Sequence, residues 1–195
     1  LNGMVLQAGR PKYVTAFGTG DTIQSWRPTV TKTGILMDVD SNEFVAKNLP
    51  MPHSPRIFDG KMYMLFSATG ELVQLDLNTG KYDVVHKLDG FVRGLARHGD
   101  YVFVGLSRLR KNSSTFAQLE IADAANYAGV AVIHLPTGAY VGELRYRASV
   151  DEIYDVQVLP GIRRPGIMNT IRPDHKQGLH IPQATYWARP DAQNS

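Results

Sequence analysis

The residues best suited to chemistry in this sequence begin with the stretch MPHSPR at 51–56. It holds His53, Ser54 and Arg56 between prolines, and each proline fixes its own φ and favours an extended conformation for the residue before it. A histidine near its ordinary pKa can act as a general acid or base, and an arginine can bind a carboxylate or phosphate through two hydrogen bonds. We therefore predict that this stretch enters a strand with His53 and Arg56 directed toward a ligand.

Two repeated phrases predict the elements that position these residues. The first is an alternating apolar run, a tight turn and a second alternating run, which is typical of a β-hairpin. It occurs as DVDSNEFVAKNL at 38–49, DLNTGKYDVVHKL at 76–88 and HLPTGAYVGEL at 134–144. The second phrase occurs as HSPRIFDGKMYMLFS at 53–67 and VRGLARHGDYVFVGLS at 92–107. Together the phrases give four antiparallel strands in about 40 residues, which is typical of a β-propeller blade.

The turns of the outer hairpins agree with this alignment. Asn42, Gly80 and Gly138 occupy equivalent places in the three hairpins and suit the positive φ that such turns need. Asp38 and Asp76 lie in the same hairpins and are predicted to be turn or solvent residues rather than catalytic ones.

The sequence thus predicts an all-β fold, a β-propeller of four-stranded antiparallel blades that is present as about 3.5 blades. The predicted boundaries are 1–49, 52–88, 91–146 and, for a partial blade, 150–168, so that 1–168 is the propeller and 169–195 an irregular C-terminal tail. A repetitive β-sandwich is the alternative fold.

The number of blades has a consequence for the ring. Propellers usually close with four to eight blades, and this chain supplies three and part of a fourth. The chain, which begins at Leu1, is therefore predicted to be the C-terminal part of a longer protein or to close its ring with another chain. Because its end blades lack neighbours, we expect the chain alone to be poorly soluble or oligomeric.

The inner strand of each blade lines the channel of a propeller, so equivalent positions meet at one mouth of the channel. Aligned on their glycine turns, the inner strands place two sets of residues there: Asn2, His53, Val92 and Tyr154, and Gly3, Ser54, Arg93 and Asp155. Glu152 and Asp155 are three apart on a predicted strand, so they point to opposite faces, and Asp155 is predicted to face the channel. We predict that His53, Arg93 and Asp155 converge, with Ser54 and Arg56 beside them.

Two long insertions, at 18–33 and 108–128, are predicted to lie over the same mouth. The first supplies Trp26, and the second supplies Arg108 and Arg110. These three side chains are predicted to cover the mouth and to contact a ligand.

The second insertion also has a helical pattern. Ser113 or Ser114 can cap a helix that runs to about Tyr127, with Phe116 and Leu119 on its apolar face. This insertion, 108–128, is the predicted contact for a protein partner.

Three phrases together resemble a known family: MPHSPRIFDGKMYML, GFVRGLARHGDYVFVGLSRLR and EIYDVQVLPGIRRP. They are similar to an uncharacterised bacterial family of conserved hypothetical proteins, a domain of unknown function with PHSPR, RGLA and EIFDVQVLPG motifs. The similarity covers residues 1–168, with Val92 before Arg93-Gly94 and Tyr154 in the aromatic place of the EIFD phrase. The resemblance implies a propeller-like fold and longer family members, and it implies no established reaction.

Composition excludes several kinds of site. The chain has no cysteine, which excludes disulfides, zinc–thiolate centres and cysteine nucleophiles. Its net charge of +3 is too small and its basic residues too scattered to favour nucleic acid, and no apolar run approaches the roughly 18 residues of a membrane span. The motifs HExxH and GxSxG are absent, and His175 and His180 lie in a proline-bearing tail without helical pattern, so no metal site is predicted.

We therefore predict that the chain binds a small anionic ligand at the channel mouth through its arginines. Two alternatives stay open: an enzyme of hydrolase, lyase or isomerase type, with His53 as general acid or base and Asp155 beside it, and a scaffold for another protein at 108–128. The absence of cysteine favours a reducing compartment, so a cytoplasmic location is predicted. The sequence indicates neither the ligand nor a cofactor nor the oligomeric state.

Overall fold

The structure, a computed structural model, describes residues 1–109, 115–148, 150–163, 165, 171, 176, 178–181 and 184–187. Within them, strands form three four-stranded antiparallel sheets and one two-stranded sheet. A three-residue 3-10 turn at Arg27–Thr29 lies in the first insertion. The chain divides into two compact units, Leu1–Val158 and Leu159–Ser195, and the three large sheets belong to the first unit.

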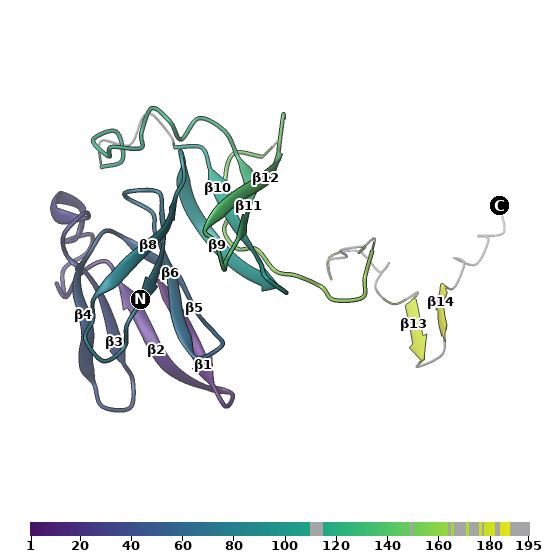
Figure 1. Cartoon of the computed structure of the whole chain (residues 1–195), viewed down its shortest axis with the longest axis horizontal. Helices are drawn as coiled ribbons and strands as arrows, with labels where there is room; N and C mark the ends of the chain where they lie inside the picture. The colour runs from purple at the N-terminus through teal and green to yellow at the C-terminus, as the bar shows by residue number, and fades with distance from the viewer. Residues whose placement is uncertain are drawn as a thin grey trace. The chain divides into compact units, whose positions relative to one another are not determined.

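Each large sheet is a meander, in which the four strands are neighbours in space in the order of the sequence (Figure 1). The first sheet contains β1 (Gly3–Gln7), β2 (Arg10–Ala16), β3 (Gly34–Asp38) and β4 (Glu43–Leu49). The second contains β5 (Pro52–Phe58), β6 (Lys61–Phe66), β7 (Glu71–Leu75) and β8 (Tyr82–Lys87). The third contains β9 (Phe91–His98), β10 (Tyr101–Ser107), β11 (Gly129–His134) and β12 (Ala139–Arg145). The all-β fold and the four-stranded antiparallel sheets that the sequence predicted are confirmed.

The second sheet lies between the other two and is buried on both faces. Along β6, Met64 and Phe66 point into a core shared with the first sheet, which includes Leu36. The alternate residue Leu65 points into a core shared with the third sheet, which includes Val104. A strand with two buried faces reads as a continuous apolar run, and the sequence MYMLF in β6 is such a run.

The first strands of consecutive sheets lie side by side: β1 contacts β5, and β5 contacts β9 (Figure 1). Hydrogen bonds join the starts of these strands. The side-chain amide of Asn2, just before β1, donates to the carbonyl of Pro52 in β5. The Ser54 hydroxyl in β5 accepts the backbone N–H of Gly94 in β9 at 2.9 Å. The starts of β1, β5 and β9 are therefore held as one group.

The outer hairpins have the predicted turn chemistry. Asn42, Gly80 and Gly138 all have positive φ, as their places in the repeat required. Asp38 and Asp76 each accept two backbone N–H groups of the turn that follows them. The prediction that these aspartates are turn residues is confirmed.

Replacing Asp76 with alanine is expected to lower the free energy of unfolding by about 0.5–1.5 kcal/mol, the usual contribution of such hydrogen bonds. Its Oδ1 accepts the N–H of Asn78 at 2.7 Å and of Thr79 at 3.2 Å. Asp76→Asn keeps an acceptor oxygen in the same place, so it should be much less destabilised. Urea denaturation of both variants measures the difference, and equal losses in the two would contradict this assignment.

The partial fourth blade predicted at 150–168 is not seen as a strand in the described residues of that range. Residues 150–158 are extended along the third sheet, where the Ser107 hydroxyl accepts the N–H of Ile153 at 2.8 Å and lies 3.1 Å from its carbonyl oxygen. The N–H of Arg108 donates to the carbonyl of Asp151 at 2.8 Å. A strand needs a partner ladder, and here a side-chain hydroxyl takes the place of that ladder.

The helix predicted in the second insertion is also wrong for the residues that the structure describes there. From 115 to 124 the chain makes a series of turns, with three-residue hydrogen bonds such as Leu119 N–H to Phe116 at 3.1 Å. Leu119, Ile121 and Ala125 are all buried in one cluster, a spacing that an α-helical stripe does not give. Tyr127 packs against a different core, between the second and third sheets. Both predicted helix caps, at 113 and 114, lie outside the described residues.

The tail at 169–195 was predicted to be irregular, and the structure corrects this. It contains an antiparallel hairpin of β13 (Gly178–Ile181) and β14 (Ala184–Trp187). The two four-residue runs, GLHI and ATYW, contain β-branched and aromatic residues that favour strands, but they are too short to stand out in the sequence. Among the described residues no helix is long and apolar enough to cross a membrane.

Candidate functional site

A cavity of about 350 Å³ lies at the starts of β1, β5 and β9. Asn2, His53 and Arg93 reach it from the first residues of β1, β5 and β9 or from just before them. Its other walls come from the two insertions, from the extended segment beside the third sheet, and from residues at or next to the ends of strands: Phe17, Trp26, Met51, Phe91, Ser107, Arg108, Leu109, Phe116 and Glu152. The meeting of inner strands and insertions at one place is what the repeat alignment predicted.

The backbone around His53 is strained. Met51 and Ser54 have φ of 59° and 49°, in the left-handed region that residues other than glycine rarely adopt. The pairing of β5 with β6 shifts between His53 and Arg56, as at a β-bulge. Such backbone strain is of order 1–3 kcal/mol per residue and often occurs at binding and catalytic sites. The stiff MPHSPR stretch therefore turns its side chains out of the regular strand alternation.

His53 is held in one tautomer by its neighbours. The Ser67 hydroxyl donates to the carbonyl of Val92 at 2.6 Å, so its only hydrogen is used. The Nδ1 of His53 lies 2.6 Å from the same hydroxyl oxygen and 3.4 Å from the carbonyl of Met51. Two acceptors therefore face Nδ1, and the hydrogen-bond network assigns the proton to that nitrogen. Ser67 is fully buried, which excludes it as a nucleophile for an external substrate.

The other ring nitrogen of His53, Nε2, faces the cavity as a hydrogen-bond acceptor. It has no hydrogen-bond partner among the described residues. It is also not fully enclosed by protein, because Thr15 Oγ1 is the only fully enclosed side-chain N or O atom without a partner among those residues. Since His53 lines the cavity and is only 5% exposed, Nε2 opens into that space. Burial, and to a smaller extent the positive charge of Arg93, lowers the pKa of His53 to about 4. His53 is therefore neutral at physiological pH.

Arg93 supplies positive charge to the same cavity. Its guanidinium lies 4.2 Å from the centre of the Tyr154 ring, in a cation–π contact. Among the described residues no carboxylate forms an ion pair with Arg93. The side chain is half-buried, so its charge is less screened than that of a surface arginine.

The remaining predicted residues of the inner strands line a second, smaller cavity. It measures about 240 Å³ and includes Ser54, Arg56 and Asp155 together with His53 and Arg93. Arg56 forms an ion pair with Asp155 at 3.1 Å, and Gln157 donates to the other carboxylate oxygen at 2.9 Å. Asp155 and Arg56 thus satisfy each other at the edge of the site.

Glu152 lines the larger cavity, and Asp155 lines the smaller one together with His53 and Arg93, so both acids reach the site. The Glu152 carboxylate accepts a hydrogen bond from the Tyr154 hydroxyl at 2.5 Å. The alternation rule that placed the two acids on opposite faces assumes a regular strand, and this segment is not paired in a sheet.

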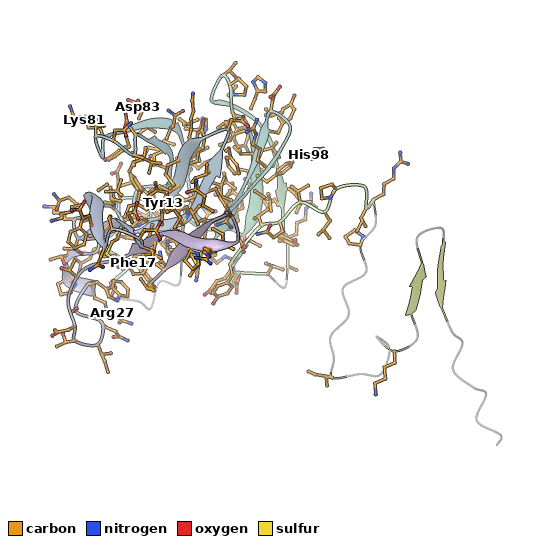
Figure 2. The ribbon with its side chains drawn as sticks, turned by 90° about the horizontal axis from the view of Figure 1, so that it is seen from below. Tyr13, Phe17, Arg27, Lys81, Asp83 and His98 are labelled. Carbon is orange, nitrogen blue, oxygen red and sulfur yellow. The ribbon has the colours of Figure 1, made fainter. Side chains whose placement is uncertain are left out.

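Both insertions line the larger cavity, the first through Trp26 and the second through Arg108. Trp26 packs edge-on against Phe17, with ring centres 4.8 Å apart, and lines the cavity. Arg108 also lines it, but its guanidinium is shared with Asp151 at 3.2 Å and with the carbonyl of Asn126 at 2.9 Å. Arg110 lies outside the described residues. Figure 2 shows Phe17 and Arg27 close together on the side of the first insertion, and His98, at the other end of β9, away from them.

Sequence reasoning missed most of the apolar walls of this site. Phe17, Phe91 and Phe116 line the cavity from three separate parts of the chain. Nothing in the sequence distinguishes Phe17 and Phe116 from ordinary core residues. Phe91 immediately precedes Val92, which the repeat alignment places level with His53, and this is the one signal that could have indicated it. The described residues contain no group of three or more histidine, aspartate or glutamate side chains placed to hold a metal ion.

Comparison with known proteins gives a family and no activity. A family model described as a domain of unknown function (DUF4915) matches residues 1–168. No curated protein matches the chain. Among solved structures it is similar to the crystal structure of the computationally designed Ika4 protein, with a TM-score of 0.46 and 12% identity over 81% of this chain and 79% of that one.

Proposed function

We propose that this chain, which belongs to the DUF4915 family of domains of unknown function, binds a small anionic molecule in the cavity formed by His53 and Arg93. The observation that carries the proposal is the state of Arg93. It is half-buried in the wall of a largely apolar cavity and lacks a carboxylate partner among the described residues. A guanidinium in such a place gains strongly from an anionic ligand, because charged groups away from bulk water are costly unless paired.

The other charges of the cavity agree with one anion bound at Arg93. Arg108 adds positive charge but is partly neutralised by Asp151. Among the described residues of the cavity wall Glu152 is the one acid, and one of its oxygens accepts the hydrogen bond from the Tyr154 hydroxyl. The positive field is therefore strongest at Arg93, which places the anionic group of the ligand on that side.

Binding is favoured over acid–base catalysis by the state of His53. A general acid or base works best when its pKa lies near the working pH. The pKa of His53 is lowered to about 4, so at neutral pH it neither carries a proton to give nor takes one up readily. Its role in this proposal is that of a fixed hydrogen-bond acceptor. Catalysis with Asp155 is less favoured still, since that carboxylate is paired with Arg56.

We also propose that the three sheets are consecutive blades of a β-propeller, with β1, β5 and β9 as inner strands around one axis. Three features support this: the meander order within each sheet, the contacts between successive first strands, and cores shared by neighbouring sheets. The cavity then lies at one mouth of the channel. The long insertions of repeat proteins often lie on one face, and that face is often the binding face.

The protein-scaffold alternative receives less support from the described part of the second insertion. There Leu119, Ile121 and Ala125 are buried beneath the first insertion, and Phe116 faces the cavity. The segment therefore builds the wall of the site, and its apolar side chains are used inside the molecule.

The proposal is tested by replacing Arg93 with alanine and measuring binding by isothermal titration calorimetry. The probes are inorganic phosphate, lactate and mandelate. We expect the acid that binds best to lose about 1.5–3 kcal/mol of binding free energy, which is tenfold or more in Kd. Arg93→Lys keeps the positive charge but lacks the planar guanidinium, so its affinity should lie between those of the unaltered protein and Arg93→Ala.

The matched control is Arg10→Ala, which removes an exposed arginine at the tip of the β1–β2 hairpin. It should leave binding unchanged, so that a general loss of positive charge is separated from the local effect. Unchanged affinity in Arg93→Ala, or no binding of any probe to the unaltered protein, would overturn the proposed function.

A further inference from the structure

Five rings form a continuous row along the wall of the cavity. In order they are Trp26, Phe17, His53, Phe91 and Phe116. Successive ring centres are 4.8, 5.2, 6.1 and 5.8 Å apart. Each step is within the range of edge-to-face or tilted aromatic contacts, so the row is one packed surface.

This row is drawn from four distant parts of the chain. Phe17 follows β2, Trp26 lies in the first insertion, His53 and Phe91 begin inner strands, and Phe116 comes from the second insertion. The neighbouring rings hold one another, and His53 is further fixed by its bond to Ser67. A flat ligand placed against such a surface finds it preorganised, which reduces the entropic penalty of binding.

We infer that the ligand of this cavity is a small aromatic acid that carries a hydroxyl or amino hydrogen-bond donor beside its acid group. This inference rests on the proposed function and adds the class of the ligand to it. The aromatic ring lies against the row of rings, the anionic group pairs with Arg93, and the donor bonds Nε2 of His53.

The need for a donor follows from the hydrogen bonds of His53. Because Ser67 and Met51 accept at Nδ1, Nε2 presents a lone pair and no hydrogen. A carboxylate oxygen placed against that lone pair would be repelled, whereas an O–H or N–H of the ligand satisfies it. His53 thus favours a hydrogen-bond donor and Arg93 favours an anionic group, and one small molecule can carry both.

The size of the cavity sets the limit of the ligand. At about 350 Å³ it is near the lower end of the range of ligand pockets, about 300–1,000 Å³. One aromatic ring with a short polar end fits this volume. Phosphorylated sugars and dinucleotides present many hydroxyls, for which this largely apolar wall offers few partners.

The test uses mandelate and three compounds that each lack one of its groups. Mandelate has a ring, a hydroxyl and a carboxylate; phenylacetate lacks the hydroxyl, lactate lacks the ring, and benzyl alcohol lacks the carboxylate. Binding is followed by the fluorescence of Trp26 in the full chain carrying Trp187→Phe. The sequence has two tryptophans, so this change leaves Trp26 as the single reporter in the cavity wall.

Three protein variants each remove the side chain that would contact one of the three groups of mandelate. Phe91→Leu removes a ring of the row and keeps an apolar side chain, with Phe116→Leu as a second variant should Phe91→Leu fold poorly. His53→Asn keeps a donor to Ser67 and removes the acceptor at Nε2. Arg93→Ala removes the cation.

We expect mandelate to bind most tightly. Phenylacetate, lactate and benzyl alcohol should each bind more weakly than mandelate, because each lacks one of its three groups. Phe91→Leu should weaken mandelate about threefold to tenfold and leave lactate nearly unchanged. His53→Asn should weaken mandelate about twofold to tenfold and leave phenylacetate nearly unchanged. Both enantiomers of mandelate are measured, and a preference for one supports a fixed three-point contact.

The contrary outcomes are distinct. Lactate binding as tightly as mandelate, with both dependent on Arg93, would overturn the aromatic-acid inference and keep the proposed function. Benzyl alcohol binding as tightly as mandelate, with no effect of Arg93→Ala, would overturn the proposed function. Absence of binding by all four compounds would overturn both.

Discussion

Replacing Gly94 with alanine is expected to lower the free energy of unfolding by about 2–4 kcal/mol and to open the wall of the cavity. Gly94 has a φ of 84°, and a Cβ at this position would lie 2.7 Å from the backbone of Asp155 and Val156. A methyl group cannot fit there without displacing the extended segment that carries Glu152. We therefore expect the variant to bind acids more weakly as well as to unfold more easily.

The control for this prediction is Gly9→Ala. Gly9 has a similar φ, 76°, but no atom lies within 4 Å of a Cβ built at that residue. It therefore measures the penalty of the left-handed backbone alone, about 1–2 kcal/mol, without the collision. Thermal and urea unfolding of the two variants give the comparison. Equal destabilisation in both would mean that the segment at 150–158 is not packed against β9 as described.

Acidification from pH 7 to pH 4 is expected to remove on the order of 3 kcal/mol of stability through His53 alone. The pKa of His53 is about 4 in the folded protein, because of its burial and the charge of Arg93, against an ordinary value of 6.5. Between these values the unfolded chain binds a proton that the folded protein does not. Stability therefore falls as the pH drops through 6.5 toward 4, and the contribution is constant above that window.

Other groups also titrate in acid, so the prediction concerns a difference between two proteins. Asparagine at position 53 does not titrate, and His53→Asn should lack this part of the pH dependence. Urea denaturation at several pH values between 4 and 7 gives both curves. Parallel curves for the two proteins would show that His53 is not held neutral in the fold.

Much of the fold was predictable because its repeat is written in local patterns. Alternation of apolar residues sets the face of each strand, and positive φ at Asn42, Gly80 and Gly138 sets the outer turns. These are properties of a few adjacent residues, and they recur three times along the chain. The three four-stranded sheets followed from them.

The failures of sequence reasoning lie where local pattern does not decide structure. The segment at 150–158 reads like the start of a fourth blade, yet without a paired second strand it is held by the side chain of Ser107. That difference also lets both Glu152 and Asp155 reach the site, each at one of the two cavities, since strand alternation no longer applies there. The turns at 115–124 fail as a helix because their apolar residues fill one cluster at irregular spacing.

The candidate site was partly predictable for a related reason. The register of the inner strands brought His53 and Arg93 to one cavity, as expected. It could not show that burial and Ser67 leave His53 neutral, with Nε2 as an acceptor. The row of aromatic rings depends on contacts between residues far apart in the sequence, and each ring alone is typical of a core residue.

Binding of an acid at Arg93 can be observed by nuclear magnetic resonance of the arginine side chains. Mandelate is added to ¹⁵N-labelled protein, and the Nε–H signal of Arg93 is assigned by its absence in Arg93→Lys. We expect this signal to shift until it saturates, with the same Kd as the change in Trp26 fluorescence, while the signal of Arg10 stays in place. An Arg93 signal that does not move while the Trp26 fluorescence reaches saturation would contradict binding at Arg93.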